Sequence, residues 1–80
     1  MTLIEIARIY TDLVQAENRI PESELIAKDE VNALRSKYHQ LLMDKFTEEG
    51  IEFTDRFQAM SMAFELVQNT DEASSTKIFV

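Results

Sequence analysis

A single glycine and a single proline in 80 residues constrain the fold of this chain more than any other feature. These two residue types supply most of the tight turns that connect β-strands. A chain with one of each has few places to reverse direction. The sequence therefore favours an all-α fold built from a small number of long helices.

The length and the lack of cysteine limit how this chain can be stabilised. A domain of this size buries only about 60% of the surface that its unfolded chain exposes. Without cysteine it has neither a disulfide nor a thiolate metal site. Small domains that lack such cross-links often gain stability by association. We therefore expect one domain that binds a second copy of itself or another protein.

The charge of the chain indicates which partners to expect. The net charge is −7 and the isoelectric point is about 4.5. Direct binding to nucleic acid or to an anionic membrane needs clustered lysine and arginine, so we expect neither. No apolar run approaches the roughly 20 residues that span a bilayer. The start, MTLIEIARIY, lacks the basic region and cleavage site of a signal peptide, so we expect a cytoplasmic protein.

The first helix is expected over residues 2–19. Thr2 and Glu5 have the spacing of a capping box, in which each side chain accepts a hydrogen bond from the other residue's amide. Several apolar residues then follow one helical stripe: Leu3, Ile6, Tyr10, Leu13 and Val14, with Ala7 at the edge. Ile4 and Ile9 fall outside this stripe, which makes them candidates for contact with a partner.

The second helix is expected over residues 29–49. Its apolar stripe comprises Val31, Leu34, Tyr38, Leu41 and Leu42, with Ala27 before it and Phe46 after it. Leu25 and Ile26 lie off this stripe at 100° per residue. Either the helix begins near Asp29, a good N-cap, with 21–27 as a separate turn, or these two residues meet another surface. Pro21 prevents a straight continuation from the first helix.

The segment KFTEEGIEFTDRF, residues 45–57, is expected to be a corner between two helices. Gly50 suits the left-handed position after a helix, with a contact between Ile51 and Phe46. Thr54 can then cap the next helix, with Asp55 in its first turn. A calcium loop would place Lys45 and Arg56 at its two outermost ligand positions, so we expect no metal site.

The third helix, expected over residues 54–69, is apolar on two faces. Phe57, Met60, Phe64 and Val67 form one face, and Ala59, Met62, Ala63 and Leu66 form the other. Because so short a chain cannot cover both faces, we assign Met60 to the core and predict a partner-binding surface. That surface comprises Ala59, Met62 and Leu66, with Ile4 and Ile9. Residues 1–69 would form a three-helix bundle and 70–80 a flexible tail, ending in KIFV.

The residues for most catalytic mechanisms are missing. The chain has one histidine, His39, no cysteine and no glycine-rich loop, so we expect neither an enzyme nor a cofactor. His39 is interpreted as a boundary residue that packs its ring against a neighbour. Five acidic residues gather around the expected corner and form a solvated acidic face: Asp44, Glu48, Glu49, Glu52 and Asp55. This face could attract a basic partner.

Two functions follow from the sequence. The first is a small acidic protein–protein interaction module, accessory or regulatory, that self-associates or docks on a partner through an apolar helix face. The alternative is an acidic decoy that occupies the basic nucleic-acid-binding groove of another protein. Strong salt dependence of partner binding would indicate the decoy, because screening weakens contacts between exposed charges.

Overall fold

The computed structural model describes the backbone of residues 1–79 and the side chains of residues 1–70. It contains three helices: α1 (Leu3–Arg19), α2 (Leu25–Glu48) and α3 (Arg56–Phe79). No strand occurs within residues 1–79. The structure thus confirms the predicted all-α fold with three helices packed against each other.

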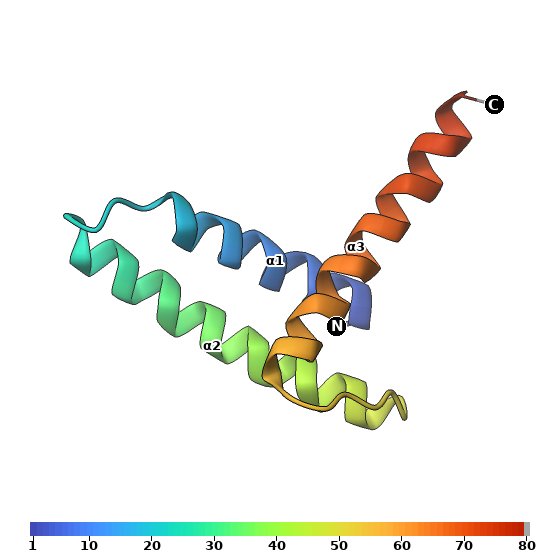
Figure 1. Ribbon diagram of the computed structural model, residues 1–80, viewed down its shortest axis with the longest axis horizontal. Helices are drawn as coiled ribbons and strands as arrows, with labels where there is room; N and C mark the ends of the chain where they lie inside the picture. The colour runs from blue at the N-terminus through green and yellow to red at the C-terminus, as the bar shows by residue number, and fades with distance from the viewer. Residues whose placement is uncertain (80) are drawn as a thin grey trace.

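The first two helices form an antiparallel hairpin, and the third crosses it. α1 and α2 lie side by side over most of their length (Figure 1). α3 begins beside α2, passes over the N-terminal half of α1 and then projects beyond the pair (Figure 1). As a result, α3 covers one face of the hairpin, and no helix within residues 1–79 covers the other.

Small residues bring α3 close to the hairpin. Ala7 of α1 and Ala59 and Ala63 of α3 are fully buried. Alanine side chains let two helix backbones approach closely, and larger neighbours then fill the remaining space. Tyr10, Leu42 and Phe46 are the largest fully buried side chains, and Ile6 completes the core.

The ends of the helices show which local predictions hold. The capping box of α1 is present: the Thr2 hydroxyl accepts the Glu5 amide at 3.3 Å, and the Glu5 carboxylate accepts the Thr2 amide at 3.3 Å. At the end of α2, Gly50 has φ +75°. The Gly50 amide donates to the Thr47 carbonyl at 3.1 Å, and the Ile51 amide donates to the Phe46 carbonyl at 2.8 Å. This is the Schellman motif expected for the predicted corner.

Three predicted boundaries are wrong. α2 begins at Leu25 rather than near Asp29, because the turn after Pro21 closes at once: the Glu24 amide donates to the Pro21 carbonyl at 3.0 Å. Asp55, not Thr54, caps α3, since its carboxylate accepts the Gln58 amide at 2.9 Å.

The third boundary is the end of α3, which runs to Phe79 rather than to residue 69. The side chains beyond residue 70, and the whole of Val80, lie outside the described residues. The backbone of the predicted tail is therefore helical through Phe79, whereas the flexibility of 70–80 and the packing of the KIFV end stay predictions.

Candidate functional site

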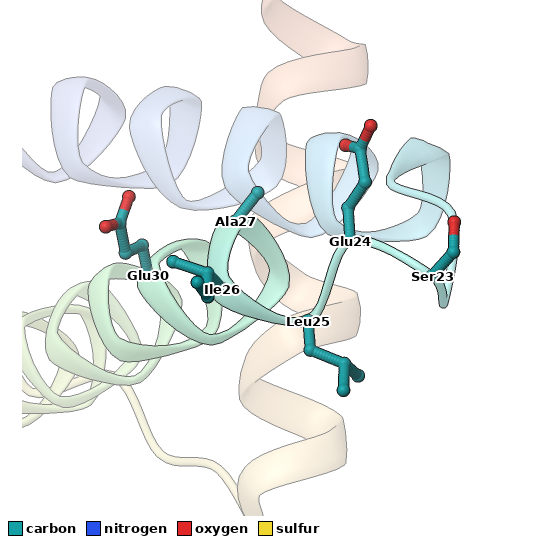
Figure 2. A pocket seen from close by; sticks show the side chains of 6 residues that line it. All are labelled: Ser23, Glu24, Leu25, Ile26, Ala27 and Glu30. Carbon is teal, nitrogen blue, oxygen red and sulfur yellow. The ribbon is translucent and has the colours of Figure 1, made fainter.

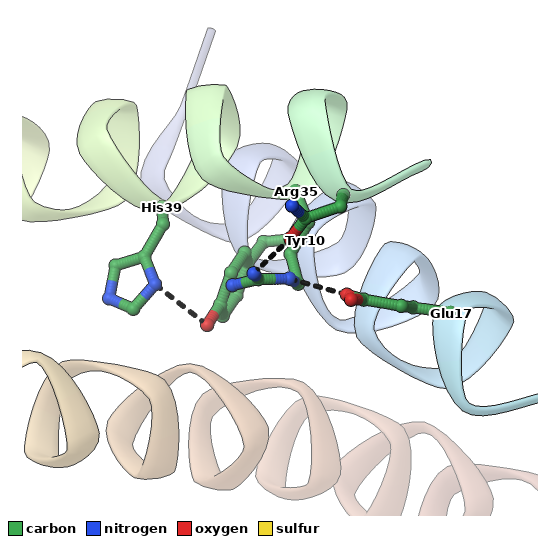
Figure 3. A network of polar contacts seen from close by, with 5 residues as sticks. Tyr10, Glu17, Arg35 and His39 are labelled. Carbon is green, nitrogen blue, oxygen red and sulfur yellow. Dashed lines mark hydrogen bonds and ion pairs between the residues drawn. The ribbon is translucent and has the colours of Figure 1, made fainter. Parts of the chain in front are cut away.

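A buried polar pair lies at the centre of the three-helix packing. The Tyr10 hydroxyl of α1 lies 3.0 Å from Nδ1 of His39 on α2 (Figure 3). Their rings meet edge to face, with centroids 4.9 Å apart. Tyr10 is fully buried and His39 is 5% exposed. The pair therefore crosses the α1–α2 interface inside the core.

The pair belongs to a longer network that includes charged residues. On the same side of α2, the Arg35 guanidinium donates to Glu17 of α1 and to Asn32 (Figure 3). Burial raises the pKa of Tyr10, while the charge of Arg35 and hydrogen bonding from it act in the opposite direction. Burial also lowers the pKa of His39, and the charge of Arg56 lowers it further. At neutral pH both rings are therefore uncharged.

The network borders a pocket of about 410 Å³ between α2 and the first turn of α3. A pocket of this size could hold a small ligand. Tyr10 and His39 contribute the buried part of the lining, and Arg56, Phe57 and Met60 of α3 contribute another part. No acidic side chain lines this pocket, although the chain as a whole has a net charge of −7.

Sequence reasoning did not find this site, because it identified only part of the buried side of α2: Leu42 and Phe46 of the predicted stripe are buried, but Leu34 and Leu41 are exposed. His39 was expected at the boundary, but it is buried, and Leu34 is 47% exposed. The inward residues follow the spacing i, i+4, i+7 and i+11: Arg35, His39, Leu42 and Phe46. This spacing is visible in the sequence, but the more apolar stripe through Leu34 and Leu41 obscured it.

The face of the hairpin opposite α3 carries apolar side chains outside the core. We call it the open face; it comprises Ile9 and Leu13 of α1 and Val31, Leu34 and Leu41 of α2. Leu34 and Leu41 are exposed and the other three are half-buried. None of the five belongs to the buried cluster, and the half-buried Ile9, Leu13 and Val31 do not pack directly against it. A two-helix layer with one uncovered apolar face is a site where a further helix can pack.

The start of α2 exposes two more aliphatic residues. Leu25 is 66% exposed and Ile26 is 79% exposed. Figure 2 shows that Leu25 projects away from α1, whereas Ala27 points toward it. Both exposed side chains border a shallow hollow of about 620 Å³ together with Glu24 and Glu30. Residues 25–27 therefore belong to α2 and do not form a separate turn. Within the described chain, Leu25 and Ile26 are mostly exposed to solvent.

The predicted partner-binding residues are distributed differently from the expectation. Ala59 is fully buried in the core, and Met62 and Leu66 are partly buried and pack against it. This face of α3 therefore contacts the rest of the chain, because its alanines allow close packing. Ile4 and Ile9 are half-buried on α1. On the other face of α3, Phe57 is 76% exposed, although Met60 is partly buried against the core as predicted.

The predicted acidic residues lie on the surface: Asp44, Glu48, Glu49, Glu52 and Asp55 are all exposed. Asp44 accepts a hydrogen bond from Gln40 at 2.9 Å, and Glu48 lies 3.6 Å from the Lys45 ammonium. Asp55 caps α3. Within the described residues, acidic and histidine side chains nowhere form a group that could hold a metal ion.

Neither a membrane helix nor a known relative explains the site. None of the described helices is long and apolar enough to cross a bilayer. The chain matches no protein-family model, no curated protein and no solved structure with which it was compared. The function must therefore be inferred from the fold and its surfaces: a three-helix, all-α domain with one apolar face uncovered.

Proposed function

We propose that this protein is a non-enzymatic interaction module whose open face binds a basic, amphipathic helix of another protein. The observation that carries the proposal is the exposure of Leu34 and Leu41, 47% and 37%, on a helix whose opposite side is buried. A partner helix on the open face would complete a four-helix arrangement. Helix-in-groove recognition of this kind reads apolar residues at helical spacing.

The charges around the open face favour a basic partner. At 100° per residue, Glu30 and Glu48 fall within about 40° of the line through Leu34 and Leu41 on α2, and so does Lys45, which pairs with Glu48. Lysines are also present on this helix, but acidic residues exceed basic ones in the chain, 15 to 8. Lysine or arginine beside the apolar residues of a partner would face these carboxylates, which adds specificity and speeds association.

The same charges disfavour a second copy of the chain as the occupant. A twofold contact through the open face would bring Glu30 and Glu48 of one copy near the same two carboxylates of the second copy. Like charges that face each other across an interface weaken it. We therefore infer that a heterologous partner, rather than a homodimer, covers the open face.

A designed peptide can test this proposal. The probe is a fluorescein-labelled amphipathic peptide of leucine and lysine at helical spacing, and its counterpart carries glutamate in place of lysine. Fluorescence anisotropy should show saturable binding of the basic peptide only. Full burial of a leucine contributes ~1.5–3 kcal/mol, so covering two half-exposed leucines contributes ~2 kcal/mol. The double change Leu34→Ser and Leu41→Ser should therefore weaken binding about thirtyfold.

A matched control separates binding at the open face from non-specific binding to exposed apolar residues. Phe57→Ser makes the same kind of change at an exposed apolar residue on α3, and it should leave the affinity unchanged. Far-ultraviolet circular dichroism checks that each variant stays folded. If the basic peptide binds the double variant as tightly as the native chain, or if Phe57→Ser weakens binding as much as the double change, the open face is not the binding site.

A further inference from the structure

The donor and the acceptor of the hydrogen bond between Tyr10 and His39 decide which nitrogen of His39 carries the proton. The positive charge of Arg35 lowers the pKa of Tyr10 against the effect of burial, which favours the Tyr10 hydroxyl as a proton donor. A hydroxyl that donates needs an acceptor, and His39 Nδ1 lies 3.0 Å from this oxygen. With Nδ1 accepting, the neutral imidazole carries its proton on Nε2. The buried network thus ends in an N–H donor.

That donor is buried and has no hydrogen-bond partner within the described protein. Nε2 lies on the side of the His39 ring away from Tyr10 and faces the first turn of α3 (Figure 3). The main-chain carbonyl of Arg56 raises the pKa of His39 against the larger effects of burial and of the Arg56 charge, yet Nε2 makes no hydrogen bond with it. Buried polar groups are rarely left unpaired, so a bound acceptor is expected here.

The surroundings of Nε2 favour a negatively charged acceptor with an apolar body. Arg56 lies close enough for its charge to depress the pKa of both His39 and Tyr10, and its guanidinium has no ion pair among the side chains through residue 70. Guanidinium groups bind carboxylates through paired N–H donors. Phe57, 76% exposed, and Met60 supply an apolar wall to the same pocket.

We propose that the pocket between α2 and α3 binds the carboxylate of a small organic acid. The carboxylate accepts a hydrogen bond from His39 Nε2 and pairs with Arg56, and the apolar part of the acid packs on Phe57 and Met60. This site is separate from the open face and does not depend on the function proposed for it. A ligand here would connect α3 to the hairpin and stabilise the folded chain.

The single histidine makes the proposal testable by nuclear magnetic resonance, because every imidazole signal belongs to His39. Benzoate is the probe, benzamide is its uncharged counterpart, and inorganic phosphate is an oxyanion without an apolar part. Benzoate should shift the imidazole signals in a saturable way, whereas benzamide should not. Benzoate should also raise the pKa of His39, since a carboxylate favours the imidazolium. The other groups that face this ring are Tyr10, Arg35 and Arg56. They are the same with and without benzoate, so a change in the pKa of His39 reports the bound carboxylate.

Two variants decide whether the pocket itself binds the probe. Arg56→Gln should weaken benzoate binding at least tenfold. Lys37→Gln removes the same charge from an exposed site outside the pocket and should have no such effect. Both residues are exposed, so neither change should unfold the chain. The proposal is overturned if benzoate leaves the His39 signals unchanged, if the two variants behave alike, or if phosphate binds more tightly than benzoate.

Discussion

Removing one oxygen atom, in the variant Tyr10→Phe, tests the buried polar network most sharply. Tyr10 is fully buried and its hydroxyl lies 3.0 Å from His39 Nδ1. Phenylalanine keeps the ring and its packing, so the loss is confined to the hydrogen bond. The His39 nitrogen is then left buried without a donor, which costs ~1–3 kcal/mol. A chain of this size has a free energy of unfolding of ~4–12 kcal/mol, so the loss is a large fraction of the total.

Urea denaturation followed by circular dichroism measures this loss. A double-mutant cycle with His39→Leu isolates the pair, because the hydroxyl has no nitrogen to contact in that background. We expect Tyr10→Phe to cost much less in the His39→Leu background than in the native chain. A coupling energy near zero, or a cost of Tyr10→Phe below ~0.5 kcal/mol in the native chain, would refute the account of the network.

Three further predictions concern the corner, the pH dependence and the state of association. Gly50→Ala should lower the free energy of unfolding by ~1 kcal/mol, because alanine disfavours φ +75° although a Cβ meets no atom within 4 Å; an unchanged urea midpoint would contradict this. Burial, with the charge of Arg56, lowers the pKa of His39 below its ordinary 6.5. The contribution of His39 to the free energy of unfolding should therefore be fully present above pH 6.5 and decline below it, until the pH passes the lowered pKa of the folded state. The reason is that the unfolded chain takes up the proton at a higher pH than the folded chain does. His39→Gln should remove this decline, and a decline that persists would have another origin. Light scattering after size exclusion should give a monomer at low and high salt, whereas a dimer lost in Leu34→Asp would indicate self-association.

The sequence predicted the local features of the fold well because their causes are local. The capping box at Thr2 depends on two side chains three residues apart. The corner at Gly50 depends on one residue that tolerates a positive φ and on the Phe46–Ile51 spacing. None of these needs knowledge of what lies opposite in space, so the pattern alone identifies them.

The sequence predicted only some of the inward residues of α2 and α3, such as Leu42, Phe46 and Met60, because the rest depend on the fit between helices. On α3, the face with Ala59 and Ala63 packs inward because small residues allow close approach. Phe57 on the other face has a much larger apolar side chain than either alanine, yet it is exposed. On α2, the hydrogen bond to Tyr10 satisfies one nitrogen of His39, so a polar ring occupies a core position. Both outcomes required the position of a partner helix, which the helical period does not give.

The central claim, that the open face receives a basic amphipathic helix, is tested most directly by nuclear magnetic resonance of the methyl-labelled protein. The leucine–lysine peptide is titrated into it, and the shift of each methyl signal is followed. The account predicts saturable shifts at Leu13, Val31, Leu34 and Leu41, with little change at the buried Leu42. Shifts centred on α3, or no shift at any of these methyl groups, would contradict the account.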